Sequence, residues 1–298
     1  MKNILVFLLI LPVYLSAWNS TGHMIVAAIA FDQLDTETQL FVRDALRNHP
    51  EYENWMEEIP EGYNEGAYLM MKASLWPDEI RRSDNIYDHP TWHYVNFFIH
   101  RESGEIDTVR EDPQNDIIWG IEKSAEFIKS EDPTLTAVYL SWLNHLVADI
   151  HQPMHCCSVI SEKSPEGDRG GNRHWVKNNG EPIKLHFYWD MLPGRISDLE
   201  DVKNAVVMLT DYFPDTDFSV FSLSDDSAYE WALESLNISY ESVHQKLTLP
   251  EADNPNDAHP LTDEYHTMAQ DVYKQRIMIA AYRLKETILS VTPGKTNE

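Results

Sequence analysis

The chain has 298 residues, of which 43% are hydrophobic, and a formal net charge of −26 at pH 7. This length fits one large domain or two small ones and can bury a sizeable core without disulfide support. Because contacts to the phosphates of duplex DNA need a basic surface, the acidic charge argues against broad duplex binding. A phosphate substrate remains possible if bound cations supply positive charge locally.

The first 17 residues have the pattern of a secretory signal peptide. Lys2 gives the positive start, residues 4–15 form the apolar core, and Ser16-Ala17 gives a small-residue end. The apolar run is short for a membrane span. We therefore expect cleavage after residue 17, which would leave Trp18 first in a soluble protein exported to a periplasm or the cell exterior. Since no linker or repeat divides the remainder, residues 18–298 are predicted to form a single domain.

Apolar residues recur at helical spacing along most of the chain, which predicts a mainly α fold. Capping residues and prolines set the expected limits of the helices. These helices cover residues 20–33, 35–48, 73–82, 115–129, 133–150, 199–212, 225–247 and 261–290.

The segments between these helices give weaker patterns. Residues 50–68 are aromatic and acidic and are expected to form a loop or short turns, and residues 92–98 are expected to be extended. Pro77 should lie near the first turn of its helix, where proline is tolerated. Asn179-Gly180 stands between HWVK and IKLHFY and predicts one small β-hairpin.

The two cysteines, Cys156 and Cys157, are neighbours in the sequence. Adjacent residues rarely reach good disulfide geometry, so we expect a fold without a disulfide. Free thiols beside His155 are an alternative source of metal ligands, but five histidines near carboxylates are better placed.

The stretch NHLVADIHQPMH, residues 144–155, closes the helix predicted at 133–150. His145 and Asp149 are four residues apart, so both side chains leave the same helix face. Pro153 ends the helix because its ring fixes φ and it has no N–H, and His155 can turn back toward the same point. Two imidazoles and a carboxylate that converge suit a zinc ion. From this stretch alone, a buried core histidine paired with Asp149 is an equal alternative.

Other histidines and carboxylates stand at informative spacings. His186 and Asp190 repeat the four-residue spacing, and Asp78 precedes Arg81 by three residues. Each also has a structural explanation, such as a helix-start carboxylate that pairs with Arg81. Two more candidates, His23 and His93, follow tryptophans. The remaining histidines lack carboxylates at such spacings and are expected to be surface or structural residues: His49, His89, His100, His151, His174, His244, His259 and His266.

Taken together, the motifs resemble the zinc-dependent single-strand-specific nucleases and 3′-nucleotidases of the S1/P1 type, in a bacterial-type form. They run in order through most of the chain after residue 17. The resemblance is carried by Trp18-x4-His23, Trp76-x-Asp78-x2-Arg81, Trp92-His93, His145-x3-Asp149-x2-Gln152-Pro153-x-His155, Gly167-Asp168-x-Gly170-Gly171-Asn172 and His186-x3-Asp190.

The resemblance implies a mainly α scaffold of the phospholipase C and nuclease type around a cleft with three zinc ions. The ligands it implies are Asp78, His93, His145 and Asp149 for one ion, His155, His186 and Asp190 for a second, and the amine and carbonyl of Trp18 with His23 and the other Asp149 oxygen for the third. Asp149 would therefore bridge two ions. The implied enzyme is a monomer without stable membrane association that cleaves single-stranded DNA and RNA to 5′-nucleotides and removes 3′-phosphates.

The implied chemistry agrees with general principles. Zinc ions about 3.5–4 Å apart can hold hydroxide at neutral pH while they screen an anionic phosphodiester. Arg81 is placed to stabilise the transition-state oxygens. Tyr94 stands where the family carries an aromatic platform for a base, with a core tyrosine as the alternative. Asn96 replaces the usual aspartate of the site, so an altered pH dependence or base preference is expected.

Two other functions remain as alternatives. Zinc-dependent phospholipase C shares the scaffold, but its last ligand pair is His-x3-Glu, whereas His186-x3-Asp190 favours a nuclease. An acidic, exported binding protein with structural zinc is less favoured. Structural zinc sites are filled by protein ligands, while a shared carboxylate cluster leaves positions open for water.

Overall fold

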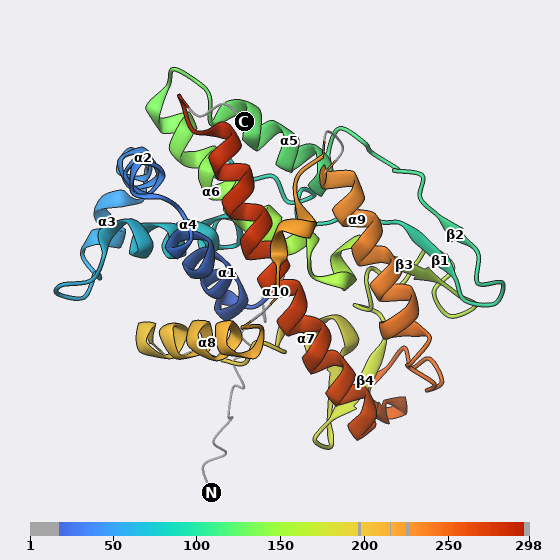
Figure 1. Ribbon diagram of the computed structural model, residues 1–298. Helices are drawn as coiled ribbons and strands as arrows, with labels where there is room; N and C mark the ends of the chain where they lie inside the picture. Colours follow the sequence, from blue (N-terminus) through green and yellow to red (C-terminus); the bar gives the residue numbers. More distant parts are fainter. Residues whose placement is uncertain (1–17, 196–197, 215, 225–226, 295–298) are drawn as a thin grey trace, which may run out of the picture.

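The computed structural model describes residues 18–195, 198–214, 216–224 and 227–294 (Figure 1). The proposed signal peptide, residues 1–17, lies outside this part of the chain. The fold is mainly α, as the sequence predicts, and its helices within these ranges are α1 (Ser20–Asp32), α2 (Thr36–Leu46), α3 (Tyr52–Met56), α4 (Glu65–Glu79), α5 (Ile117–Phe127), α6 (Pro133–Ile150), α7 (Leu185–Asp190), α8 (Leu199–Tyr212), α9 (Ser227–Ile238) and α10 (Asp263–Val291).

Short strands and turns complete the architecture. The strands are β1 (Phe98–His100), β2 (Ile106–Asp107), β3 (Ser158–Ile160), β4 (Trp175–Asn178), β5 (Glu181–Lys184) and β6 (His259–Pro260). The short turns are η1 (Pro153–Cys156), η2 (Phe218–Phe221) and η4 (Pro255–Asp257), which are 3₁₀-helical, and η3 (Ser239–His244), which is π-helical.

Helix α6 lies in the middle of the bundle and contacts α1, α2, α4, α5, α9 and α10. In Figure 1 the long α10 runs diagonally across the molecule. Asp132 starts α6 by accepting from the N–H groups of Thr134 and Leu135, and Pro133 occupies the first helical position. Almost every residue from Thr136 onward is buried. A helix that is apolar on all sides needs such a surrounding, and its burial fixes the position of its few polar side chains.

The C-terminal end of α6 confirms the predicted stop. The helix ends at Ile150, and Pro153 begins the single turn η1. The Gln152 side chain caps this turn by accepting from the Met154 N–H at 2.6 Å. The turn reverses the chain and brings His155 back toward α6.

Helix α4 begins eight residues earlier than the sequence predicts. Residues 50–68 contain α3 and the first turn of α4 as well as loop, so the loop prediction is partly wrong. Asn64 caps α4 by accepting from the Ala67 N–H at 3.0 Å. Gly66 lies so close to Phe31 that an added Cβ would be 2.6 Å from its ring. Tertiary packing therefore outweighs the loop-like composition. Because the helix starts early, Pro77 lies in the last turn of α4 rather than in its first turn.

The predicted hairpin is present as β4 and β5, joined by Asn179 and Gly180 at positive φ. Its second strand is shorter than predicted, because α7 begins at Leu185 and carries His186. Strand β6 adds to β4 in parallel. A second sheet, of order β2-β1-β3, was not predicted.

This second sheet ties the extended segment at 92–98 to the chain after η1. Strand β1 begins only at Phe98, and the N–H of Val95 already donates to the carbonyl of His155 at 2.9 Å. Phe97 likewise accepts from Ser158 at 2.8 Å. The pairing holds His93 and His155 in a fixed relation, although they are 62 residues apart.

The other helices follow the predicted limits closely, with one exception. The helix expected at 225–247 ends at Ile238 and continues as the π-helical turn η3, while residues 225–226 lie outside the described ranges. Cys156 and Cys157 are buried free thiols, so the expectation of no disulfide is confirmed. Within the described ranges, no helix combines the length and apolar character that crossing a bilayer needs.

Candidate metal centre

Asp149 lies at the middle of a buried group of histidines. Its Oδ1 atom is 3.2 Å from Nε2 of His23 on α1, and its Oδ2 atom is 3.1 Å from both Nδ1 of His93 and Nε2 of His145. The helical spacing of His145 and Asp149 produces the last of these contacts. The two carboxylate oxygens therefore face different partners.

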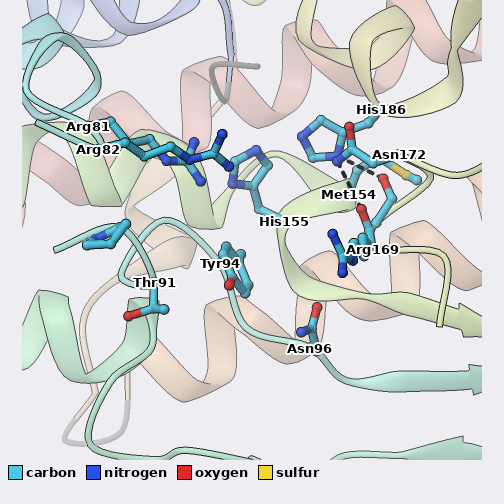
Figure 2. Close-up of a pocket in the computed structure, with 12 residues that line it drawn as sticks. Arg81, Arg82, Thr91, Tyr94, Asn96, Met154, His155, Arg169, Asn172 and His186 are labelled. Carbon is cyan, nitrogen blue, oxygen red and sulfur yellow. Dashed lines mark hydrogen bonds between the residues drawn. The ribbon is translucent and has the colours of Figure 1, made fainter. Parts of the chain in front are cut away.

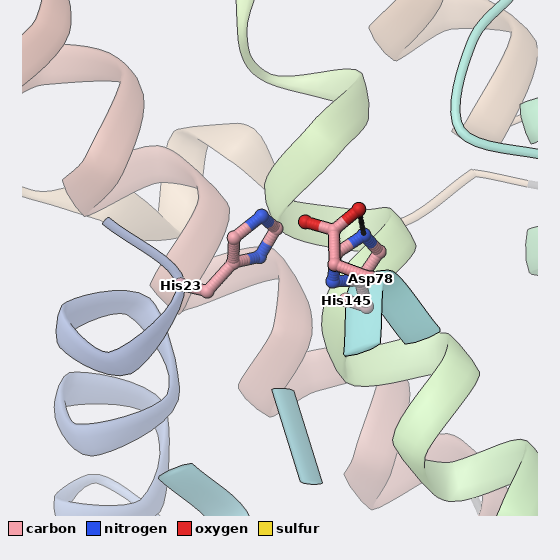
Figure 3. Close-up of side chains that lie close together, drawn as sticks. All are labelled: His23, Asp78 and His145. Atoms are coloured by element: carbon pink, nitrogen blue, oxygen red, sulfur yellow. Dashed lines mark ion pairs between the residues drawn. The ribbon is translucent and has the colours of Figure 1, made fainter. Parts of the chain in front are cut away.

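Asp78, at the end of α4, closes this group from the other side. Its Oδ1 atom is 3.7 Å from Nδ1 of His93, 3.9 Å from Nε2 of His145 and 3.9 Å from Nη1 of Arg81. Figure 3 shows His23, Asp78 and His145 converging from three separate helices. The rings of His23 and His145 are stacked, with centroids 4.1 Å apart.

A second group combines η1 with α7. His186 and Asp190 occupy one face of α7, with Nε2 and Oδ2 3.6 Å apart, and the ring of His155 lies 4.9 Å from that of His186. Gln152 donates to Oδ1 of Asp190 at 2.7 Å. The other carboxylate oxygen of Asp190 is buried without a hydrogen-bond partner among the described residues.

Backbone carbonyls orient three of the imidazoles. Nδ1 of His145 lies 2.7 Å from the carbonyl of Ser74, Nδ1 of His155 2.5 Å from that of His93, and Nδ1 of His186 2.7 Å from that of Gly170. A carbonyl can only accept, so each Nδ1 carries a proton and Nε2 is the nitrogen of each ring that can bind a metal ion. This is the usual arrangement around metal-binding histidines.

These groups fit a set of divalent metal sites. The donor atoms form three sets, and within each set they lie within 4.8 Å of one another. The sets are His23, Asp78 and His145; His93, His145 and Asp149; and His155, His186 and Asp190. Donor atoms of a tetrahedral zinc site are about 3.3 Å apart. Nε2 of His155 and Oδ2 of Asp190 are buried and have no hydrogen-bond partner within the described ranges. Nitrogen and carboxylate donors left open in this way match the preferences of zinc.

The protonation states agree with this interpretation. Burial alone would raise the pKa of the Asp149 carboxyl, but His145 and the neighbouring imidazoles hold it well below its usual range. Burial lowers the pKa of His93 to about 4 and that of His186 to about 3. Against the effect of burial, Asp149 and Asp78 raise the pKa of His145 to about 9, so a metal ion would displace a proton there.

Trp18 lies beside the second group. It is fully buried, and its side chain packs so closely on Gly22 that an added Cβ would be 2.7 Å from Cβ of Trp18. The next N–H, of Asn19, donates to the carbonyl of Asp190 at 3.1 Å. The structure thus places the predicted first residue of the processed chain next to the backbone of Asp190, while its role as a ligand stays a prediction.

A cavity of about 490 Å³ adjoins these groups (Figure 2). Its wall includes His155 and His186 together with Arg81, Tyr94 and Asn96, the residues to which the sequence assigned transition-state or substrate contacts. Tyr94 and Asn96 are both half-buried, so neither is a closed core residue.

Several features of the site were missed by sequence reasoning. Gln152 belongs to the quoted motif but was given no role, and the three orienting carbonyls leave no trace in residue type. Arg82, Arg169 and Asn172 also line the cavity, although no spacing pointed to the two arginines. Cys156 and Cys157 and the eight other histidines do not belong to the three donor groups.

Comparison with known proteins agrees with the motif order. Residues 18–292 match the S1/P1 nuclease family. The chain is similar to Endonuclease 5 of Arabidopsis thaliana, with 24% identity over 187 residues, 58% of this chain and 55% of the plant protein. It is also similar to Endonuclease 3 of the same plant, with 24% identity over 185 residues, 58% of this chain and 53% of that protein. Each match spans about half the length of the plant relative. Because the family match covers nearly all residues from Trp18 onward, the chain belongs to the S1/P1 nuclease family.

Proposed function

We propose that this protein is a zinc-dependent nuclease that hydrolyses phosphodiester bonds in single-stranded DNA and RNA. The observation that supports it most is the position of Asp149, with one oxygen facing His23 and the other facing His93 and His145. A carboxylate shared in this way suits neighbouring metal ions beside an open cavity. In this proposal residues 18–298 act as one domain.

The proposal assigns three zinc ions to these residues in the sets that the family resemblance implies, so that His23 is separated from Asp78 and His145. The first is held by Asp78, His93, His145 and Asp149, and the second by His155, His186 and Asp190. The third is held by His23, the other Asp149 oxygen and the terminal amine and carbonyl of Trp18. When bound, such ions supply Lewis acidity and lower the pKa of bound water.

The side chains of this chain supply orientation and charge. Arg81 lies at the cavity wall with its Nη1 atom 3.9 Å from Asp78, where its guanidinium can donate to phosphate oxygens. Gln152 holds Oδ1 of Asp190 and so fixes how that carboxylate faces His186. Tyr94 offers an aromatic face on which an unpaired base can stack, and Asn96 offers hydrogen bonds to a base edge.

One site can serve both proposed substrates. Cleavage of a strand to 5′-phosphate products breaks the bond between phosphorus and the 3′-oxygen, and removal of a 3′-phosphate breaks the same bond. Single strands are favoured because their bases are free to stack, whereas a chain with a net charge of −26 offers little basic surface to a duplex.

The proposal also includes export. Cleavage after residue 17 would free the amine of Trp18, and Asn19 already holds this end of the chain against Asp190. An amide nitrogen at Trp18 would be a poor ligand because its lone pair is delocalised. The site would then be completed only in the processed protein, as a monomer in the periplasm or outside the cell.

The test is to measure the metal content of the processed protein and assay it on four substrates. We expect three zinc ions per chain and hydrolysis of single-stranded DNA and of a 3′-mononucleotide. Duplex DNA and phosphatidylcholine should be cleaved far more slowly. Chelation should abolish activity, and zinc should restore it. Preferential hydrolysis of phosphatidylcholine would instead indicate a phospholipase C, and absence of hydrolysis by the zinc-loaded protein would indicate a binding protein.

A further inference from the structure

We propose that Arg82 and Arg169 bind the backbone phosphates on either side of the scissile phosphate, so that the preferred substrate is an extended single strand rather than a mononucleotide. This inference rests on the proposed function and adds residues that no motif identified. Both arginines line the cavity beside His155 and His186. Figure 2 shows Arg82 alongside Arg81 on one side of His155 and Arg169 on the other side, near Asn96 and Asn172.

The two guanidinium groups have no carboxylate partner within the described part of the protein. Both residues are exposed, and neither guanidinium has an ion pair or a side-chain hydrogen bond within the described ranges. The chain carries 49 acidic residues and only 23 lysines and arginines. Because acidic residues are in such excess, two arginines at one cavity without carboxylate partners indicate a binding site for an external anion.

The backbone at both positions gives independent support. Within the described residues, only Arg82, Arg169 and Asn179 have positive φ without being glycine, at 62°, 56° and 51°. Asn179 is in the hairpin turn, where asparagine is expected. Arginine is disfavoured in this conformation by the contact of its Cβ with the backbone, and glycine would adopt it without cost. Strained positions of this kind cluster at functional sites.

Hydrogen bonds hold both strained positions in place. The N–H of Arg82 donates to Oδ2 of Asp88 at 2.7 Å, and the N–H of Arg169 donates to Oγ of Ser158 at 3.1 Å. The carbonyl of Arg169 also accepts from the Asn172 side chain at 2.9 Å. The base of each side chain is therefore fixed, while its charged end remains open to the cavity.

The ligand follows from this arrangement. With the scissile phosphate at the metal centre, a single strand continues on both sides and carries one phosphate per nucleotide. The planar guanidinium group binds phosphate through paired hydrogen bonds. A 3′-mononucleotide has no flanking phosphate, so its hydrolysis gains nothing from Arg82 or Arg169.

The experiment uses Arg82→Gly, Arg169→Gly and the double variant. Their kcat/KM is measured on a pentanucleotide and on a dinucleoside monophosphate, which has only the scissile phosphate. At low salt we expect a loss of about tenfold per arginine on the pentanucleotide. The loss on the dinucleoside monophosphate should stay below about twofold, because no flanking phosphate is lost. The slope of log(kcat/KM) against log salt concentration should fall by about 0.7 for each lost phosphate contact.

Controls separate this role from a structural one. Lys129→Ala removes one exposed positive charge outside the cavity, and Asn179→Gly relaxes the same backbone conformation without a charge change. Neither variant should alter the ratio of kcat/KM on the pentanucleotide to kcat/KM on the dinucleoside monophosphate. A pentanucleotide with neutral methylphosphonate linkages beside the scissile phosphate should lower wild-type kcat/KM as the arginine variants do, and those variants should then lose nothing more. Because glycine relaxes the backbone, the midpoint of thermal unfolding of the arginine variants should equal or exceed that of the wild type.

Equal losses on both substrates, or no loss on either, would overturn the inference. So would a reduced unfolding midpoint with equal losses, which would make the arginines structural. If the wild type hydrolyses neither substrate, the proposed function fails, and fluorescence anisotropy of the labelled pentanucleotide on zinc-loaded protein tests the subsite alone. Weaker binding by the double variant would support it, and unchanged binding would overturn it.

Discussion

Helix α6 and the turn after it contribute histidines to two buried polar clusters. In the metal centre, Nε2 of His145 lies 3.1 Å from Oδ2 of Asp149, and Nε2 of His155 is buried with no hydrogen-bond partner among the described residues. In the second cluster, both nitrogens of His151 are bonded, with Nδ1 2.7 Å from the carbonyl of Val147 and Nε2 2.9 Å from Nη1 of Arg283. His145 and His151 are both fully buried, so burial alone does not distinguish a ligand from a structural histidine.

The carboxylates of the two clusters also differ in their partners. Glu234 accepts from both terminal nitrogens of Arg283, at 2.6 and 2.7 Å, and from Arg276 at 3.1 Å. Arg276 also donates to the carbonyl of His151 at 3.1 Å. Asp149, in contrast, has histidines as its partners and no arginine or lysine among the ion pairs of the described residues. The comparison teaches that a carboxylate paired with arginines is structural, while a buried carboxylate surrounded by imidazoles is open to metal.

The largest expected effect comes from Asp149→Asn. An amide cannot offer two anionic oxygens to two ions, so this variant should lose nearly all hydrolysis of single-stranded DNA and more than one zinc ion per chain. Activity assays with metal analysis check both results. Normal metal content would contradict the bridging role and would make Asp149 resemble Glu234.

The N-terminus gives the next largest effect. A chain that starts Met-Trp18, with the methionine retained, has an amide in place of the terminal amine. We expect it to keep its helical content, measured by circular dichroism, but to lose one zinc ion and most turnover. The processed protein is the control. Equal zinc content and equal rates would reduce the proposal to two ions and leave Trp18 as a buried aromatic residue.

Glu234→Gln is the matched carboxylate-to-amide change in the second cluster. It leaves the buried Arg276 and Arg283 without their counter-charge, which in a closed site costs several kcal/mol. Because the Glu234 side chain is 39% exposed, solvent screening reduces the expected loss of unfolding free energy to about 1–3 kcal/mol. Zinc content and the pH dependence of hydrolysis should not change. A lost zinc ion would show that the two clusters are coupled.

The stability effect of Glu234→Gln should depend on pH. Burial alone would raise the pKa of Glu234, but Arg283 and Arg276 hold it below its usual value of 4.5. Its contribution is therefore complete above pH 4.5 and is lost as the pH falls through the lower pKa of the folded state. Urea unfolding with chelator present should show that the difference in unfolding free energy between wild type and variant becomes smaller in acid. A difference in unfolding free energy that is constant with pH would contradict the ion-pair explanation.

The same comparison explains which parts of the molecule were predictable. Helix α6 was predicted to the residue because Asp132, Pro133 and an apolar run act locally. The early start of α4 was not predictable, since it depends on packing between Gly66 and Phe31. His145 and His151 look alike in sequence, and carboxylate spacing separated them. The carbonyls that orient His155 and His186 meet these rings only in the folded chain, and the positive φ of Arg82 and Arg169 has no sign in the residue type.

Asn96→Asp should give the smallest effect and would show how far the cavity wall differs from the ligand groups. Asn96 lines the cavity but belongs to none of the three donor sets, so the variant should bind normal zinc. A carboxylate at this position adds a titratable charge and removes an amide donor, and it restores the residue usual in the family. We therefore expect a shifted pH–rate profile or a changed ranking of the four 3′-mononucleotides, with little change in the maximal rate. Asn178→Asp, on β4 outside the cavity wall, is the matched control. An unchanged profile and ranking would show that Asn96 takes no part in the working site, and a loss of zinc would place it among the ligands.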